Sequence, residues 1–362
     1  MLKNIKIIFI VVLFMIAEIV LLSMASKQDF YFEPEYTLKE FARLNDAKPG
    51  KIKHELEMSD VRGSATLFEL GIDQDRALHV LSHVKGRFEA EKRVLVQTIF
   101  ALFAAVIIFL LCKNRMNSVV KMVLLLISIA CFGFLLGKSY NPMTGMVKFI
   151  KGIAGIEPNI AAWGLVFVCF LLLSMIGTKV VCGWICPFGA LQELIYKIPG
   201  LGKFKTKYKI PFWLSNSVRI MVFLGCIIAL LSNLFGLREQ GRVIYHVINP
   251  FNLFEFNFSL VSIPVYIGII FISAYLFYRP HCYLVCPFGL FSWLFEKMSV
   301  FKVRIDRGKC TDCKACVKAC PGLAMEGIYA EKLLSADCFS CGECLDSCKF
   351  DALSYSCDSK KD

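Results

Sequence analysis

The sequence has few histidines and none of the common motifs that bind haem or nucleotides. Five histidines occur in 362 residues, and none is central in a long apolar run, so a bis-histidine b-type haem within a bilayer is not expected. No C-x-x-C-H segment is present, which excludes a covalently attached c-type haem. No G-x-G-x-x-G fingerprint or P-loop opens a βαβ unit, which argues against NAD or ATP binding. A haem, NAD or ATP site is therefore not expected in this chain.

Cysteine is abundant: the chain has 17, and eight of them form two regular runs near the C-terminus. Both runs have the spacing C-x2-C-x2-C-x3-C, in which the fourth cysteine binds the cluster held by the other run. We therefore expect one [4Fe-4S] cluster on Cys310, Cys313, Cys316 and Cys348, and a second on Cys338, Cys341, Cys344 and Cys320. Zinc and disulfides fit this pattern less well, because zinc sites usually pair two C-x2-C units.

Composition and long apolar runs predict a membrane protein. Hydrophobic residues make up 57% of the chain and its mean hydropathy is +0.60. Six runs approach or exceed the roughly 18 apolar residues that cross a bilayer: Ile5–Ala25, Val94–Cys112, Val119–Gly137, Ala161–Val181, Trp213–Phe235 and Leu260–Phe277. The expected fold is an all-α polytopic membrane bundle of about six spans, with a C-terminal α+β two-cluster ferredoxin domain.

The basic residues predict the orientation of the chain. Lys and Arg concentrate before the first span, between spans two and three, and after span four, which places these segments in the cytoplasm. Both termini are then cytoplasmic, in the plasma (inner) membrane of a bacterium. Lys138, Lys148 and Lys151 run against this trend. The net charge of +12 indicates topology and contact with anionic lipid rather than binding to nucleic acid.

Four segments are expected along the chain. Residues 1–26 form a membrane anchor or a signal peptide, and residues 27–93 an extracytoplasmic helical insert. Within the insert, Thr37 and Thr66 each begin a capping-box pattern, and Asp73 to Arg93 is expected to form a helix leading into span two. Residues 94–299 form a five-span membrane core, and residues 300–357 the ferredoxin domain.

The membrane core contains a repeated motif. Cys182-Gly-Trp-Ile-Cys186-Pro-Phe-Gly recurs 100 residues later as Cys282-Tyr-Leu-Val-Cys286-Pro-Phe-Gly, and Asn-Pro pairs precede each copy, at 141–142 and 249–250, in expected outer loops. Both copies have the same orientation, which predicts two parallel repeats about an axis along the membrane normal. Residues i and i+4 share one face of a helix, so each C-x3-C is expected to present two thiols side by side at the cytoplasmic edge.

The four thiols of Cys182, Cys186, Cys282 and Cys286 can serve several chemistries. A third iron–sulfur cluster is the leading interpretation. Dithiol/disulfide chemistry, another soft metal such as copper(I), and purely structural cysteines are the alternatives. On the outer side, Tyr245 and His246 offer polar groups and a proton acceptor to a quinol head group, although the same residues can simply anchor an outer segment.

From about residue 95 to 357 the chain resembles the membrane polyferredoxins of the NapH/NosR type. The resemblance rests on Cys182, Cys186, Pro187, Cys282, Cys286, Pro287 and the eight ferredoxin cysteines. It implies quinone-linked electron transfer with periplasmic partners. The chain departs from this family in its outer helical insert and in lacking the large outer flavin domain of the NosR branch.

These observations favour a membrane-bound iron–sulfur electron-transfer protein, acting as a quinol dehydrogenase subunit or a related carrier. Its expected partners are the quinone pool, a membrane or periplasmic redox protein, and a ferredoxin-like donor in the cytoplasm. The alternatives are a copper reductase or maturation factor for a respiratory enzyme, and a redox regulator.

Overall fold

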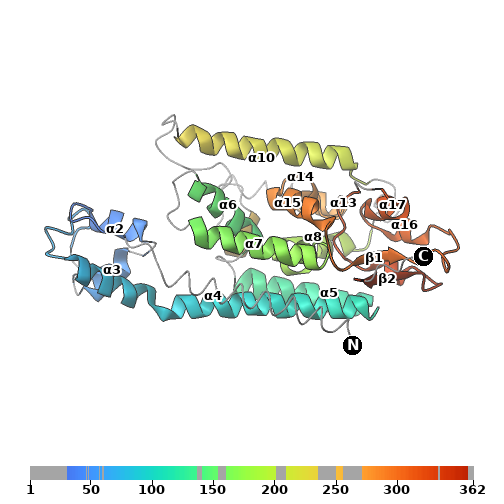
Figure 1. The fold of residues 1–362 in the computed structure, drawn as a ribbon, viewed down its shortest axis with the longest axis horizontal. Coiled ribbons are helices and arrows are strands. Elements are labelled where there is room, and N and C mark those ends of the chain that lie inside the picture. Colours follow the sequence, from blue (N-terminus) through green and yellow to red (C-terminus); the bar gives the residue numbers. More distant parts are fainter. Residues whose placement is uncertain are drawn as a thin grey trace.

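The protein is mostly helical and elongated (Figure 1). The computed structural model describes residues 31–45, 47, 49–56, 58, 61–136, 141–153, 160–200, 209–234, 250–255, 271–332 and 335–357. In Figure 1 the N-terminal helices α2 and α3 lie at one end, the strands β1 and β2 lie at the other, and the longer helices connect them.

The insert, at one end, forms a small helical unit with its own core. Helix α2 (Leu38–Leu44) begins at Thr37, whose side chain accepts from the Glu40 N–H while Glu40 binds back to Thr37, so the first predicted capping box is confirmed. The second pattern makes the same reciprocal bonds between Thr66 and Glu69 but opens only a turn, so the helix expected there is wrong. Helix α3 (Pro49–Glu55) packs nearby around Phe41, which is buried.

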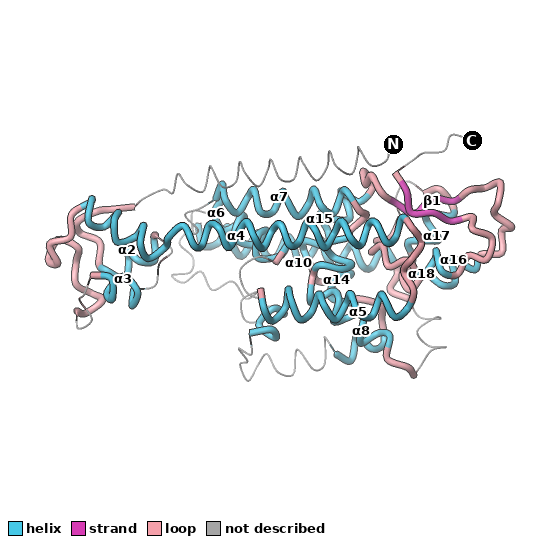
Figure 2. The backbone as a smooth tube through the Cα atoms, turned by 90° about the horizontal axis from the view of Figure 1, so that it is seen from below, coloured by secondary structure: helices cyan, strands magenta, loops and turns pink. Residues whose placement is uncertain are grey.

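Helix α4 (Gln74–Cys112) runs from the insert toward the strands, as Figure 2 shows. Asp73 caps it by accepting from the Arg76 N–H at 2.8 Å, so the predicted helix into span two is confirmed. Helix α5 (Ser118–Ile127), capped by Asn117, continues as the π-helix η1 (Ser128–Leu135).

Among the described residues, two helical stretches are long and apolar enough to cross a membrane: Leu95–Cys112 in α4, and Ser118–Leu135 across α5 and η1. They coincide with the second and third expected spans. The fourth and fifth fall on α7 (Ile160–Ile176) and α10 (Phe212–Leu234), whose apolar parts are shorter. The first expected span and most of the sixth lie outside the described residues.

Shorter helices fill the interior of the bundle. They are α6 (Pro142–Ile153), the π-helix η3 (Val181–Ile185), α8 (Pro187–Lys197), the 3-10 helix η4 (Pro250–Glu255), α13 (Ser273–Leu276), α14 (Pro280–Leu284) and α15 (Pro287–Glu296). Pro187 and Pro287 occupy the first turns of α8 and α15, where a proline costs no helical hydrogen bond.

The C-terminal segment is α+β. Strands β1 (Lys302–Ile305) and β2 (Leu353–Ser356) pair antiparallel, with Val303 opposite Tyr355. Between them lie the short helices α16 (Ala315–Ala319), α17 (Ala324–Tyr329) and α18 (Glu343–Asp346).

This segment is fastened to the bundle through backbone groups. The N–H groups of Val300 and Phe301 donate to the carbonyls at the end of α7, at 3.0 and 2.9 Å. The Ser340 hydroxyl donates to carbonyls of the turn that follows α7, and Trp184 donates its indole N–H to the Ser340 carbonyl at 3.2 Å. Gly183 lies so close to the Phe339 carbonyl that a Cβ at this position would overlap it.

We therefore expect Gly183→Ala to push the loop around Phe339 away from the bundle. Hydrogen exchange should become faster in residues 335–341 while the long helices keep their protection. Gly225→Ala in α10 is the matched control, because a Cβ there meets no atom within 4 Å. Equal exchange in both variants would contradict the close contact.

Candidate functional site

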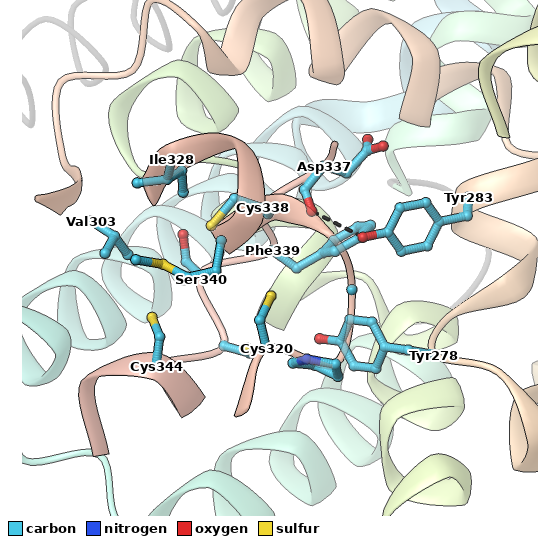
Figure 3. A pocket seen from close by; sticks show the side chains of 16 residues that line it. Tyr278, Tyr283, Val303, Cys320, Ile328, Asp337, Cys338, Phe339, Ser340 and Cys344 are labelled. Atoms are coloured by element: carbon cyan, nitrogen blue, oxygen red, sulfur yellow. Dashed lines mark hydrogen bonds between the residues drawn. The ribbon is translucent and has the colours of Figure 1, made fainter. Parts of the chain in front are cut away.

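Four cysteines of the C-terminal segment surround one cavity. Cys338, Cys341 and Cys344 come from the second run, and Cys320 is the last cysteine of the first run. Figure 3 shows the sulfur atoms of Cys320, Cys338 and Cys344 pointing into the same space. The remaining wall is mainly apolar and includes the rings of Tyr278, Tyr283 and Phe339. Cys320 thus lies with the second run rather than with its own.

Burial makes these thiols poor acids in the absence of a metal. It raises the pKa of Cys341 to about 12, and it also raises the pKa values of Cys338, Cys344 and Cys320. Nearby thiols add to the rise in each of the three second-run cysteines, because neighbouring thiolates repel one another. A metal centre deprotonates its thiol ligands and compensates their charge, so this donor set suits an iron–sulfur cluster.

The other ferredoxin cysteines form a second group, in which Cys313 is exposed and Cys310, Cys316 and Cys348 are partly buried. Cys316 is within electrostatic range of Cys310 and of Cys348, so the last cysteine of the second run joins the first run. Cys313 is exposed, and the N–H of Ala315 lowers its pKa. Cys344 is also within range of Cys316, which makes the two groups of cysteines neighbours.

The repeated C-x3-C segments bring their four thiols together. All six pairs among Cys182, Cys186, Cys282 and Cys286 are close enough to interact electrostatically. The expected α-helical spacing is wrong, however. In each copy the second cysteine has left the helix, with φ and ψ of −66° and 113° at Cys186 and −70° and 112° at Cys286.

The same hydrogen bond shapes both copies. The Cys186 N–H donates to the Val181 carbonyl at 2.8 Å, and the Cys286 N–H donates to the His281 carbonyl at 2.9 Å. Both bonds span five residues, as in a π-helix, which often marks a functional site. This wider turn, and not an ideal α-helix, sets the position of the second thiol in each motif.

Cys186 and Cys286 lie beside an apolar cluster, although Arg219 is also within electrostatic range of Cys286. These two residues pack with Met143 of α6 and with Phe251 and Phe254 of η4. Asn141, from the first Asn-Pro pair, is buried just before α6, and its expected place in an outer loop stays a prediction. Asn249, from the second pair, lies outside the described residues. Tyr245 and His246 lie outside the described residues.

The opposite side of the site faces residues 335–341, which we call the ferredoxin loop. Buried charged side chains lie on this side. Asp337 is fully buried and pairs with Lys179 and with Arg219, whose nitrogens lie 2.9 and 2.8 Å from its oxygens. Arg279 pairs with Glu193 and donates to the Cys182 carbonyl at 2.5 Å.

Aromatic side chains lie between the cysteine-lined cavity and the four-cysteine site. The Phe339 ring lies 5.2 Å from the Lys179 ammonium and 5.0 Å from the Arg279 guanidinium. Tyr283, within the second C-x3-C motif, donates its hydroxyl to the Asp337 carbonyl at 3.0 Å and packs against Phe339. The ferredoxin loop therefore touches both copies of the motif.

Among the described residues, no three His, Cys, Asp or Glu side chains are close enough to hold a single metal ion. The ligands of a cubane cluster are instead distributed around a core of four irons.

Comparison with known proteins gives the class. A family model described as a 4Fe-4S binding domain matches residues 160–211, which include the first C-x3-C motif. A model described as a 4Fe-4S dicluster domain matches residues 280–324, which include the second motif and the first ferredoxin run. The chain is therefore a 4Fe-4S ferredoxin-type protein.

Relatives refine this class. The uncharacterised protein MJ0750 of Methanocaldococcus jannaschii is 31% identical over 54% of this chain and 79% of its own length. The putative electron transport protein YccM of Escherichia coli is 26% identical over 58% of this chain and 60% of its own length. The ferredoxin-type protein NapH of Haemophilus influenzae is 25% identical over 49% and 62%, respectively. No solved structure matches the chain. The chain belongs to the NapH-type polyferredoxin family of electron-transport proteins.

Sequence reasoning missed the buried charges. Lys179 and Arg279 each stand three residues before the first cysteine of a motif, and both have left-handed backbone with φ of 57° and 48°. A basic residue at the same place in both copies was the available signal. Asp337 and Glu193 had no such signal, because a single acidic residue next to a cysteine run is common.

We expect Asp337→Asn to loosen the ferredoxin segment. The change leaves the buried Arg219 without its counter-ion and Lys179 with only Glu296, 3.9 Å away. Breaking a buried pair in this way typically costs about 3–5 kcal/mol. Faster hydrogen exchange around residues 335–341 would report the loss. Glu331→Gln is the control, because its ion pair with Arg307 is largely exposed. If both variants exchange like the wild type, the buried network does not hold the interface.

Proposed function

We propose that this chain is an electron carrier of the bacterial plasma membrane that holds three [4Fe-4S] clusters and connects the quinone pool with a redox partner. The observation that carries the proposal is the contact between two thiol-lined sites. The loop that bears Cys338 and Cys341 packs through Phe339 onto Gly183 in the first C-x3-C motif and onto Tyr283 in the second.

Two clusters are assigned to the ferredoxin segment. One cluster is assigned to the cavity lined by Cys320, Cys338, Cys341 and Cys344, and the other to the second group of Cys310, Cys313, Cys316 and Cys348. Two positions support this assignment. Cys320, the last cysteine of the first run, lies with the second run, and Cys348, the last of the second run, lies near Cys316.

The third cluster is assigned to Cys182, Cys186, Cys282 and Cys286. Two motifs with matching backbone supply two thiols each, all within electrostatic range of one another. Clusters bound at these sites supply acceptors for single electrons. The protein holds the sites in contact, buries the cysteine-lined cavity and the four-cysteine site, and places buried cations beside the four-cysteine site.

The outward faces of the long helices support a membrane location. Large apolar side chains are exposed along three helices, and such continuous surfaces are rare on soluble monomers. They include Leu95, Leu102, Val106 and Phe109 on α4; Val119, Met122, Val123 and Leu126 on α5; and Trp213, Met221, Leu224 and Ile228 on α10. We propose about six spans in two parallel repeats, with both termini and the ferredoxin segment in the cytoplasm.

The partners are proposed from chemistry. A quinol releases electrons and protons together, so it needs a polar site near the bilayer surface, for which Tyr245 and His246 are candidates. The exposed Cys313 side of the ferredoxin segment is open to a soluble, ferredoxin-like protein in the cytoplasm. A membrane or periplasmic redox protein completes the path. Relatives named NapH and MauN are described as ferredoxin-type proteins, and MauN as acting in methylamine utilisation.

Iron content tests the three sites. Anaerobically purified wild-type protein should contain about twelve irons per chain, from three clusters of four irons each. Cys182→Ser and Cys286→Ser should each lose about four while keeping the EPR signals of the ferredoxin clusters. Cys357→Ser, outside all three sets, is the control. About eight irons in the wild type would rule out the third cluster.

Quinol oxidation tests the link to the membrane. Added menaquinol should reduce the clusters of the wild-type protein, as followed by EPR, and Cys182→Ser should block that reduction if the four-cysteine site lies on the path. Tight copper(I) binding that is lost in Cys182→Ser, without any reduction by quinol, would favour a copper-handling protein instead.

A further inference from the structure

Two buried polar side chains contact the sulfurs of the four-cysteine site. Gln192 lies in α8 and Ser292 in α15, and both are fully buried. They are 100 residues apart, the same offset as the cysteines, so they occupy equivalent places in the two copies. Polar side chains are seldom buried completely without a role in structure or chemistry.

Each of these side chains reaches the cysteine of the other copy. The Gln192 amide nitrogen lies 3.4 Å from Cys282 Sγ, and the Ser292 hydroxyl lies 3.6 Å from Cys182 Sγ. In a free thiol either the sulfur or the hydroxyl can donate. Once the sulfur is bound to iron it carries no proton, so the hydroxyl becomes the donor.

Backbone groups fix the orientation of the Gln192 amide. Its oxygen accepts from the His281 N–H at 2.9 Å, and its nitrogen donates both to the Phe188 carbonyl at 3.2 Å and to Cys282 Sγ. The oxygen faces a donor and the nitrogen faces an acceptor, so the amide cannot reverse without losing bonds. Ser292 is held less firmly, because the Gly289 carbonyl, 3.2 Å away, competes for its proton.

Buried cations lie close to the site. Lys179 and Arg279 are within electrostatic range of both Cys182 and Cys282, and Arg219 is within range of Cys286. Asp337, which pairs with Lys179 and Arg219, is also within range of Cys282. The cations favour negative charge added to a cluster here.

We propose that Gln192 and Ser292 are positioning residues that set the reduction potential of the cluster in the four-cysteine site, each by a hydrogen bond to the cysteine of the other copy. This inference rests on the third cluster proposed above. Hydrogen bonds to sulfur stabilise the reduced, more negative state of an iron–sulfur cluster and so raise its potential. Gln192, as the better-oriented donor, has the larger effect.

The test is an EPR-monitored redox titration of the full chain, purified anaerobically. Gln192→Leu removes one donor and Ser292→Ala removes the other. Both should lower the midpoint potential of the third cluster, Gln192→Leu by about 59 mV, which is a tenfold change in a one-electron equilibrium. Ser292→Thr keeps the hydroxyl and should restore the wild-type value. The two ferredoxin clusters serve as internal references and should not shift.

Ser299→Ala is the matched control. It also removes a buried hydroxyl, but this hydroxyl donates to the Ser174 carbonyl instead of a sulfur. An unchanged midpoint in Gln192→Leu and Ser292→Ala, with twelve irons present, would overturn the inference. Loss of four irons in both variants would overturn it too, because the residues would then serve assembly alone. Eight irons in the wild type would refute the third cluster itself.

Discussion

The buried carboxylate of Asp337 is the interaction on which the arrangement of the sites depends. It has no exposed surface, and it lies between Lys179 from the bundle and Arg219 from α10. A buried charge is tolerated only when its partners are in place, because desolvation otherwise exceeds the attraction. Asp337 precedes Cys338, so satisfying its charge also places the cysteine loop against the bundle. Correct docking and correct placement of the thiols are therefore one event.

The duplicated motif makes the two copies depend on each other. Arg279 of the second copy binds the Cys182 carbonyl of the first, and Lys179 of the first binds the Gly289 carbonyl of the second at 2.9 Å. Gln192 and Ser292 cross in the same way. Each copy therefore depends on the other for polar contacts to its cysteines and backbone. A single C-x3-C segment in another protein would consequently lack the polar groups that this site receives from its duplicate.

Much of the organisation was predictable from residue spacing. The two cysteine runs indicated a ferredoxin segment, and the caps at Thr37 and Asp73 marked helix starts, because these signals act over a few residues. The burial of Asn141 was not predictable, since it depends on tertiary packing that no local pattern records. The departure of Cys186 and Cys286 from the helix was also missed. It arises from a five-residue hydrogen bond and the following proline, and the i+4 spacing alone does not reveal it.

Helix α4 holds the insert and the ferredoxin segment far apart. It has 39 residues, which at 1.5 Å per residue makes it about 58 Å long. Its first turn belongs to the insert, and near its other end Leu111 lies against Gly342, beside the cysteine-lined cavity. Electronic coupling falls off exponentially with distance. A protein bound only to the insert is thus too remote to exchange electrons with the ferredoxin cysteines. The insert can bind such a partner but cannot pass electrons to it or from it.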